Sequence, residues 1–168
     1  MIQIRPAQPD DANAIIHLVR QIIAEPASNL LLSEGEFNYT EDEEREILRQ
    51  CSQSENSLYL VAEEGQTLTG MLHCTGGSRK ATRHETTLSM SIAKAYRNQG
   101  LGSKLLEEAI AWAKANPRIT RMDLVVFERN QAAMHLYSKF GFEVEGHHRH
   151  TIYRDGEYLD SISMALVW

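Results

Sequence analysis

Apolar residues recur along the chain at two spacings, one typical of strands and one typical of helices. Ile2 and Ile4 alternate with polar residues, which predicts a short opening strand. The apolar positions between Ile15 and Ile22 follow helical spacing. The Asp10–Asp11 pair in front of them predicts the N-terminal cap of that helix, so the chain is expected to open as strand and then helix.

An irregular connection and a second helix are predicted next. The stretch Glu25–Tyr39 contains proline, serine, asparagine and glycine, so we expect a loop that could border a pocket. Thr40 and Glu43 match a capping box and predict a helix through about Gln50. The acidic run Glu41–Glu46 is expected to form the exposed face of this helix, although it could also attract a cationic substrate.

The middle of the chain is dominated by strand patterns. Leu58–Ala62 and Thr67–Thr75, joined by a Glu64–Gly65 turn, predict a hairpin. Thr86–Ile92 predicts a further strand after an intervening loop. Three consecutive strands imply an antiparallel sheet.

Two helices and one strand are predicted after this sheet. Gly100–Ala115 carries one apolar face and predicts the best-formed helix of the chain. Met122–Phe127 predicts a strand. Asn130 is expected to cap a short helix, which Gly141 closes in the left-handed conformation that glycine favours.

The tail from Phe142 onward alternates as two strands around an Asp155–Gly156 hairpin turn. The complete order is therefore β-α-α-β-β-β-α-β-α-β-β. This order predicts an α/β fold in which a central mixed, mostly antiparallel sheet is flanked by helices. No repeat or linker interrupts the pattern, so residues 1–168 are predicted to form a single domain.

Composition narrows the class of protein. Hydrophobic residues make up 42% and charged residues 24% of the chain, as in ordinary soluble proteins, and no signal peptide or membrane span is evident. We therefore expect a cytoplasmic protein. The net charge of −6 argues against a nucleic-acid partner and favours a cationic or neutral small substrate. Cys51 and Cys74 stand far apart, which supports neither a disulfide nor a zinc site.

The segment Ser91–Ser103 joins the end of a predicted strand to the best-formed helix. A helix N-terminus presents unpaired N–H groups, and Gly100 and Gly102 would let an anion approach the backbone closely. Two glycines can also simply make a tight turn. The dinucleotide fingerprint fails because Leu105 stands where its third glycine belongs, and the nucleotide P-loop pattern fails as well.

Two spaced motifs carry a family resemblance. Arg97-x-x-Gly100-x-Gly102 resembles the R/Q-x-x-G-x-G/A motif of the GNAT superfamily of N-acetyltransferases. The segment Asn130–Phe142 resembles the N-x-x-A-x-x-x-Y-x-x-x-G-F segment of the same family, and the predicted element order agrees with its fold. The tail looks like bacterial members of the ribosomal-protein acetyltransferase type, many of which act on free metabolites, so this likeness implies no particular acceptor.

The resemblance implies acetyl-CoA as the acetyl donor. It places the pantetheine arm beside the strand that ends at Ile92, with Asn130 as a contact to that arm. It also implies that the pyrophosphate lies on the backbone N–H groups of Arg97, Asn98, Gln99, Gly100, Leu101, Gly102 and Ser103.

Acyl transfer to an amine needs a neutral nucleophile, a donor for the negative charge that develops on the carbonyl oxygen, and a proton for the leaving thiolate. Helical spacing alone indicates a structural role for Tyr137, packed beside its neighbours on the helix. Its position seven residues after Asn130 implies, through the resemblance, that Tyr137 is the general acid. For the carbonyl oxygen we expect a backbone N–H near Ile92, where parting strands would leave a donor unpaired.

Three residues are candidates for the general base, namely His73, His84 and Glu85, because they lie on or beside the central strands. Each could equally be structural or exposed. An amine could also bind as its minor neutral fraction without any base.

The histidines of the tail raise the question of a metal. His147, His148 and His150 fall on a predicted strand, so only His148 and His150 are expected to share a face. We interpret them as a solvated edge and predict no metal.

Two classes of function therefore remain. The first is an N-acetyltransferase that acts on a primary amine of a small molecule or a protein N-terminus. The alternative is a non-catalytic module that binds or senses CoA with the same fold. By the family, Glu25–Tyr39 and His148–Tyr158 would set acceptor specificity, but neither carries a recognisable motif. A homodimer is expected by base rate.

Overall fold

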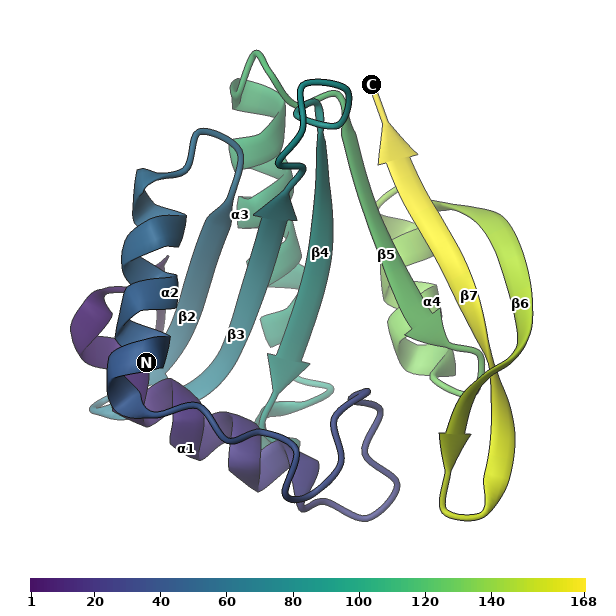
Figure 1. The fold of residues 1–168 in the computed structure, drawn as a ribbon, viewed down its shortest axis with the longest axis horizontal. Coiled ribbons are helices and arrows are strands. Elements are labelled where there is room, and N and C mark those ends of the chain that lie inside the picture. Colours follow the sequence, from purple (N-terminus) through teal and green to yellow (C-terminus); the bar gives the residue numbers. More distant parts are fainter.

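Seven strands form one sheet in the computed structural model, which describes residues 1–168 (Figure 1). The strands are β1 (Ile2–Pro6), β2 (Leu58–Glu64), β3 (Thr67–Gly76), β4 (Glu85–Ile92), β5 (Arg121–Phe127), β6 (Glu143–Arg154) and β7 (Glu157–Val167). The helices are α1 (Ala12–Ile23), α2 (Glu41–Gln53), α3 (Leu101–Ala115) and α4 (Gln131–Lys139). Two short 3-10 helices, Pro9–Asp11 and Lys94–Tyr96, complete the structure.

The sheet has the order β1-β2-β3-β4-β5-β7-β6. Every neighbouring pair is antiparallel except β4 and β5, which run parallel. The α/β fold, its mixed and mostly antiparallel sheet and the predicted order of helices and strands are therefore confirmed.

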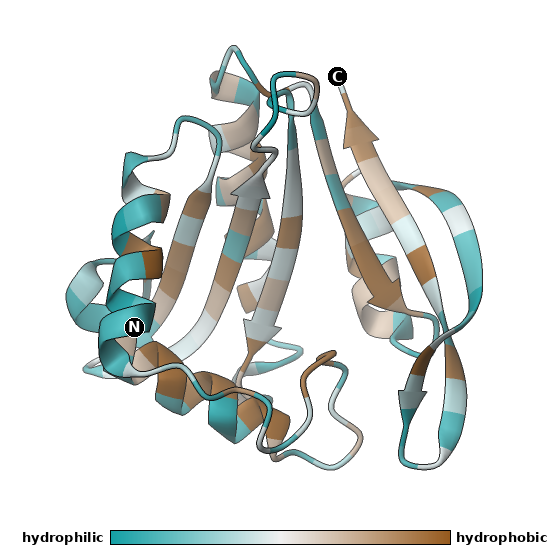
Figure 2. Cartoon of the chain, in the orientation of Figure 1, coloured by the Kyte–Doolittle hydropathy of each residue, from teal (hydrophilic) through white to brown (hydrophobic).

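Helices cover both faces of the sheet, and the alternation of side chains along β2 shows why both faces are buried. Tyr59 and Val61 pack with α1 and α2, whereas Leu60 and Ala62 pack in a second cluster with α3. Figure 2 shows brown, hydrophobic bands that alternate with paler or teal ones along the strands of the sheet, and a mostly hydrophilic α2 and β6. None of the helices is both long and apolar enough to cross a membrane.

The two parallel strands stay together over a short distance only. β4 and β5 pair from Glu85 opposite Arg121 to Thr87 opposite Asp123, and no strand pairing follows. Each of the two strands stays paired with its neighbour on the other side. β4 pairs with β3 as far as Ile92, and β5 pairs with β7 as far as Phe127. The sheet therefore opens between β4 and β5, as Figure 1 shows.

Polar side chains hold the closed end of this opening. The Arg121 guanidinium donates to both carboxylate oxygens of Glu145, at 2.8 and 2.6 Å, and lies 3.3 Å from the Asp123 carboxylate. The Thr87 hydroxyl donates to Asp123 at 2.8 Å and so links the two strands directly. The opening thus begins at a fixed position in the sheet.

Two local predictions were wrong. The Asp11 side chain does not cap α1, because its carboxylate is taken by Arg5, at 2.8 Å to both oxygens, and by the Gln8 N–H, at 2.7 Å. The turn between β2 and β3 lies at positions 65–66 rather than at Glu64–Gly65, because Glu64 still pairs with its partner across the hairpin.

The predicted cap of α2 is confirmed and can be tested. The Thr40 hydroxyl accepts from the Glu43 N–H at 3.2 Å, and the Glu43 carboxylate accepts from the Thr40 N–H at 2.8 Å. We expect Thr40→Ala to lower the free energy of unfolding by about 1 kcal/mol in urea denaturation, because one N–H at the helix start loses its partner. Thr40→Ser keeps the hydroxyl and should stay close to wild type. Equal losses in both variants would contradict the capping role.

Candidate active site

A cavity of about 720 Å³ lies where β4 and β5 separate. Side chains from α1, α2 and the loop between them line it from one face of the sheet, and side chains from α3 and α4 line it from the other. The cavity therefore passes through the opening in the sheet. Of its 31 lining residues, 20 are hydrophobic, so the few polar groups stand out against an apolar wall.

The start of α3 offers a run of free hydrogen-bond donors. None of the backbone N–H groups from Asn98 to Ser103 donates a hydrogen bond within the chain. Asn98 and Gly100 both have positive φ, at 59° and 81°, and Gly100 caps the 15-residue helix without a side-chain bond. Several unpaired N–H groups at the positive end of a helix form a site for an anion such as a pyrophosphate.

The glycine at position 102 keeps this site open. A Cβ atom there would lie 3.1 Å from the Leu136 side chain and 3.4 Å from Ile92. The backbone of α3 therefore approaches α4 and β4 more closely than a side chain would allow. The residues present thus fit a phosphate group that rests directly on the backbone.

We call the free N–H groups of residues Asn98–Ser103 the cradle. Arg97 connects this cradle with two other elements. Its Nε donates to the Ile92 carbonyl at 2.8 Å, and its guanidinium lies 2.7 Å from the Glu25 carboxylate, just after α1. One Glu25 oxygen is buried without a hydrogen-bond partner. The sequence analysis did not identify Glu25, because a glutamate in a loop carries no motif that marks it.

Most of the residues predicted for the cofactor site meet at this cavity. Those that line it are Ile92, Arg97, Asn98, Gly100, Gly102, Ser103 and Asn130, and the predicted general acid Tyr137 lines it as well. Two predicted residues do not line it. The Gln99 side chain turns back to donate to the Ala95 carbonyl at 2.7 Å, and Leu101 is buried in the core at 3% exposure. Their backbone N–H groups still belong to the free run. The Arg97 N–H does not, contrary to the prediction, because it donates to the Lys94 carbonyl at 3.3 Å and closes the short 3-10 helix.

The free edge of β4 also presents backbone donors. Ala93 donates to β3, at 2.9 Å from the Thr69 carbonyl, so by strand alternation the N–H groups of Ser91 and Ser89 face β3 as well. The N–H groups of Met90 and Ile92 therefore face the opening. This agrees with the expected position of an unpaired donor near Ile92.

Two side chains of α4 face the same opening. Asn130 accepts from the Ala133 N–H at 3.3 Å and so caps the helix as predicted, while its amide nitrogen makes no bond within the chain. Tyr137 is 6% exposed and packs against Phe142, and its hydroxyl donates no hydrogen bond within the chain. Burial raises the pKa of the Tyr137 phenol to about 12, so the hydroxyl keeps its proton at neutral pH.

The structure separates the three candidates for the general base. His73 lies on β3, lines the cavity and stacks on Tyr59 with ring centroids 4.7 Å apart. Burial lowers the pKa of His73, which favours the neutral imidazole that a base requires. His84 and Glu85 lie at the other end of β4, at the closed end of the opening, and neither lines the cavity. Glu85 lies 4.0 Å from Arg121.

The tail histidines do not follow the predicted alternation. A bulge between His148 and Ile152 interrupts β6, and His150 has a φ of 55°. His147 lies 2.8 Å from Asp160 and 3.4 Å from Glu128 at the surface. An exposed imidazole between two carboxylates is an ordinary surface ion pair, and that no metal takes part stays a prediction.

The acidic run of α2 contains one residue that the sequence analysis placed wrongly. Glu44 is 4% exposed and lines the cavity, whereas its neighbours in the run are exposed or half-buried. Glu44, Leu48 and Cys51 form the buried stripe of α2. The spacing of these three residues is the signal that could have identified Glu44.

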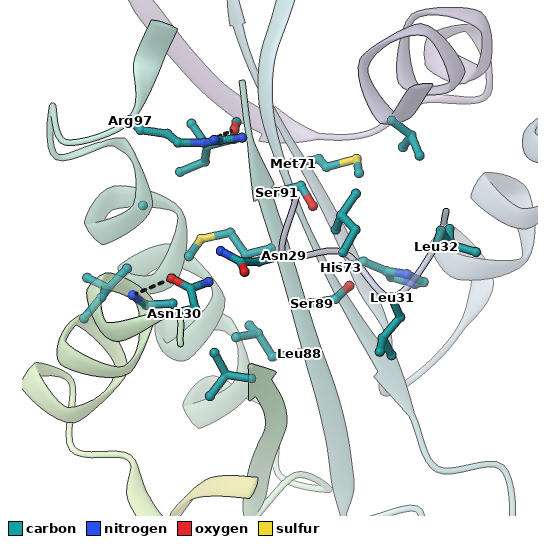
Figure 3. A pocket seen from close by; sticks show the side chains of 18 of the residues that line it. Asn29, Leu31, Leu32, Met71, His73, Leu88, Ser89, Ser91, Arg97 and Asn130 are labelled. Atoms are coloured by element: carbon teal, nitrogen blue, oxygen red, sulfur yellow. Dashed lines mark hydrogen bonds between the residues drawn. The ribbon is translucent and has the colours of Figure 1, made fainter. Parts of the chain in front are cut away.

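The cavity has two ends that differ in chemistry. We name the end formed by the cradle and α4 the cofactor end, after the predicted binding of acetyl-CoA, and the other the acceptor end; Figure 3 shows Arg97 and Asn130 on the first side of β4. The acceptor end comprises the lining residues of α1, α2, their loop, β2 and β3, including His73, Leu31 and Leu32.

The acetyltransferase (GNAT) family model matches residues 24–142, which is well over half of the chain. The chain therefore belongs to the GNAT family of acetyltransferases, as the two motifs predicted.

The names of curated relatives refer to different amine acceptors. An L-amino acid N-acetyltransferase from Escherichia coli (strain K12) is 34% identical over 89 residues, which cover 53% of this chain and 55% of that protein. A spermidine N(1)-acetyltransferase from the same strain is 29% identical over 75 residues, which cover 45% and 40%. The chain thus spans about half the length of the curated relatives it matches.

Solved structures match the fold along the whole chain. An acetyltransferase of the GNAT family from Streptococcus pneumoniae has a TM-score of 0.95 and 35% identity, with 99% of each chain covered. A phosphinothricin acetyltransferase from Sinorhizobium meliloti in complex with acetyl-CoA has a TM-score of 0.86 and 21% identity, covering 99% of this chain and 88% of that one. A ribosomal-protein-alanine N-acetyltransferase from Brucella melitensis has a TM-score of 0.85 and 22% identity, covering 99% of each. Because the last two are only 21% and 22% identical, they show a shared fold alone. The ribosomal-protein-alanine acetyltransferase is one of several structural neighbours.

The close approach at Gly102 generates a test of the cradle. We expect Gly102→Val to raise the Kd for CoA roughly tenfold in isothermal titration calorimetry, because a branched side chain would crowd Leu136 and Ile92 and displace the start of α3, whereas the family motif accepts alanine here. Glu108→Val, on an exposed position of the same helix, is the matched control. An unchanged Kd in a folded Gly102→Val variant would show that CoA does not rest on the start of α3.

Proposed function

We propose that this chain is an N-acetyltransferase that moves the acetyl group of acetyl-CoA to a primary amine of a small molecule or of a protein N-terminus. The observation that carries this proposal is the run of free N–H groups from Asn98 to Ser103 beside the unpaired edge of β4. Family membership and the acetyl-CoA complex of the Sinorhizobium meliloti protein support it.

The cofactor end would hold acetyl-CoA. The free donors of the cradle suit its pyrophosphate, and the open edge of β4 suits its extended arm, with the unbonded amide nitrogen of Asn130 as a donor beside it. Acetyl-CoA would supply an activated thioester. The chain itself contributes positioning, because each of these groups is fixed by secondary structure.

Three groups of the chain have the chemistry that the transfer requires. Tyr137 has a protonated phenol and no internal partner, so it can donate a proton to the leaving thiolate. The N–H groups of Met90 and Ile92 can stabilise negative charge on the carbonyl oxygen. His73 is the candidate base, because among the three predicted bases it alone lines the cavity.

Several finer expectations remain part of this proposal. The ribosomal-protein acetyltransferase type is supported by the tail motif and by one neighbour of that name, and it implies no acceptor. A cytoplasmic location and a homodimer are also proposals. The alternative function, a CoA-binding module without turnover, would use the same cradle, but Tyr137 would then transfer no proton.

The experiment that tests the proposed function is thiol release from acetyl-CoA across amino acids, polyamines, aminoglycosides and peptide N-termini. Release with one acceptor class supports the enzyme. Tight CoA binding without release in any class would favour the non-catalytic module.

The role of Tyr137 generates a second test. We expect Tyr137→Phe to lower kcat by about 10²- to 10⁴-fold, because the proton donor is lost while the ring still packs. Tyr153→Phe, at a tyrosine that is 66% exposed and outside the cavity, is the control. A wild-type rate in Tyr137→Phe would rule out the general acid.

The raised pKa of Tyr137 sets the expected pH profile. A general acid is lost only as the pH rises through its own pKa, which burial raises to about 12. Wild-type kcat should therefore rise as the acceptor amine loses its proton and should show no alkaline decline up to about pH 10. A decline centred between pH 8 and 9 would point to another acid.

A further inference from the structure

The acceptor end of the cavity contains a single formally charged side chain. Among the lining residues only Glu44 and Arg97 carry a formal charge, and Arg97 belongs to the cofactor end, where it pairs with Glu25. Glu44 is 4% exposed, and its carboxylate has neither a hydrogen bond nor an ion pair within the chain. An unpartnered carboxylate therefore faces the acceptor end.

Nothing around Glu44 compensates its charge. The nearby Tyr59 hydroxyl donates to the Met71 sulfur at 3.3 Å instead. Tyr59 and Glu44 line the same end of the cavity, and burial raises the pKa of both side chains. Phe37 and Ile47 add apolar walls. A carboxyl group in such surroundings either takes up a proton, which the raised pKa favours, or keeps its charge beside a cation, so we look for that cation in the acceptor.

The sheet indicates how far Glu44 lies from the reacting end. Tyr59 of β2 pairs with His73 of β3, and His73 pairs with Ser89 of β4. Neighbouring strands lie about 4.8 Å apart, so Tyr59 and the free edge of β4 are about 10 Å apart across the sheet. Glu44 enters the cavity from α2, which packs over β2, two strands away from the free edge of β4, so we assign it to a group of the acceptor other than the reacting amine.

We propose that Glu44 binds a second ammonium group of the acceptor, and that the acceptor is an aliphatic diamine or polyamine. The reacting amine then lies at the edge of β4, and the methylene chain crosses the apolar wall between the two groups. This inference rests on the proposed acetyl transfer and specifies its substrate class.

An α-amino acid fits the same surroundings poorly, because no free cation is available for its carboxylate. Arg129 and Arg154 are near the loop between α1 and α2, but neither lines the cavity. Arg129 donates to Asn29 and to the Ser28 carbonyl, and Arg154 donates to the carbonyls of Ser28 and Leu32, all within 3.0 to 3.1 Å. Both guanidinium groups are thus used to hold the loop.

The test compares 1,4-diaminobutane with n-butylamine, which has the same chain and no second amine. We expect wild type to favour the diamine by at least about tenfold in kcat/KM, and Glu44→Gln to remove this preference by raising KM for the diamine alone. Asp42→Asn, at an exposed position of the same helix, makes the same charge change and should keep the preference.

Binding gives a readout that does not depend on turnover. In calorimetry with CoA present, 1,4-diaminobutane should bind wild type and Asp42→Asn about equally, and Glu44→Gln at least about tenfold more weakly. Glu44→Asp keeps the charge on a shorter side chain, so its preference should move toward a longer diamine such as 1,5-diaminopentane. A purely structural role for Glu44 would produce no such shift in chain length.

The outcomes separate the two proposals. Equal use of butylamine and diaminobutane by wild type, or an unchanged preference in Glu44→Gln, would overturn the role of Glu44 while turnover itself upholds the acetyltransferase. Efficient turnover of neutral α-amino acids but not of diamines would overturn the substrate class. Absence of both CoA binding and turnover with any amine would overturn the proposed function and this inference with it.

Discussion

The short pairing between β4 and β5 is the constraint on which the rest of the site depends. Three residue pairs join these strands, and each strand is then held by its outer neighbour along its full length. The facing edges keep backbone donors that no strand satisfies, and a buried unpaired donor needs a partner. Because Arg121 and Thr87 hold the closed end through Glu145 and Asp123, the opening has a defined origin.

Polar groups are distributed unevenly along the cavity that results. The cofactor end offers backbone donors at the start of α3 and the paired guanidinium of Arg97, a combination that suits an anion. The acceptor end offers one unpartnered carboxylate among apolar side chains. A molecule that crosses between these ends therefore meets opposite electrostatic preferences, which supports an anionic donor and a cationic acceptor.

Local patterns were sufficient for most of the fold and for the cradle. The capping box at Thr40, the cap at Asn130 and the left-handed Gly141, with a φ of 89°, depend on neighbours within a few residues, so the sequence predicts them well. Predictions failed where a neighbouring element or an irregularity of strand pairing intervenes. Asp11 gives its carboxylate to Arg5 across a turn, and the alternation expected for the tail histidines is broken by a bulge in β6.

The sequence by itself determined the element order, the family and the glycine-rich start of α3, because each depends on residues that are close together in the chain. Only the tertiary structure decided which side chains share the cavity. It brought His73 to the cavity and left His84 and Glu85 at the closed end, although all three were equivalent candidates in the sequence. It also buried Glu44 in an otherwise solvated acidic run. Strand register and helix rotation set these outcomes, and both depend on contacts between residues far apart in the chain.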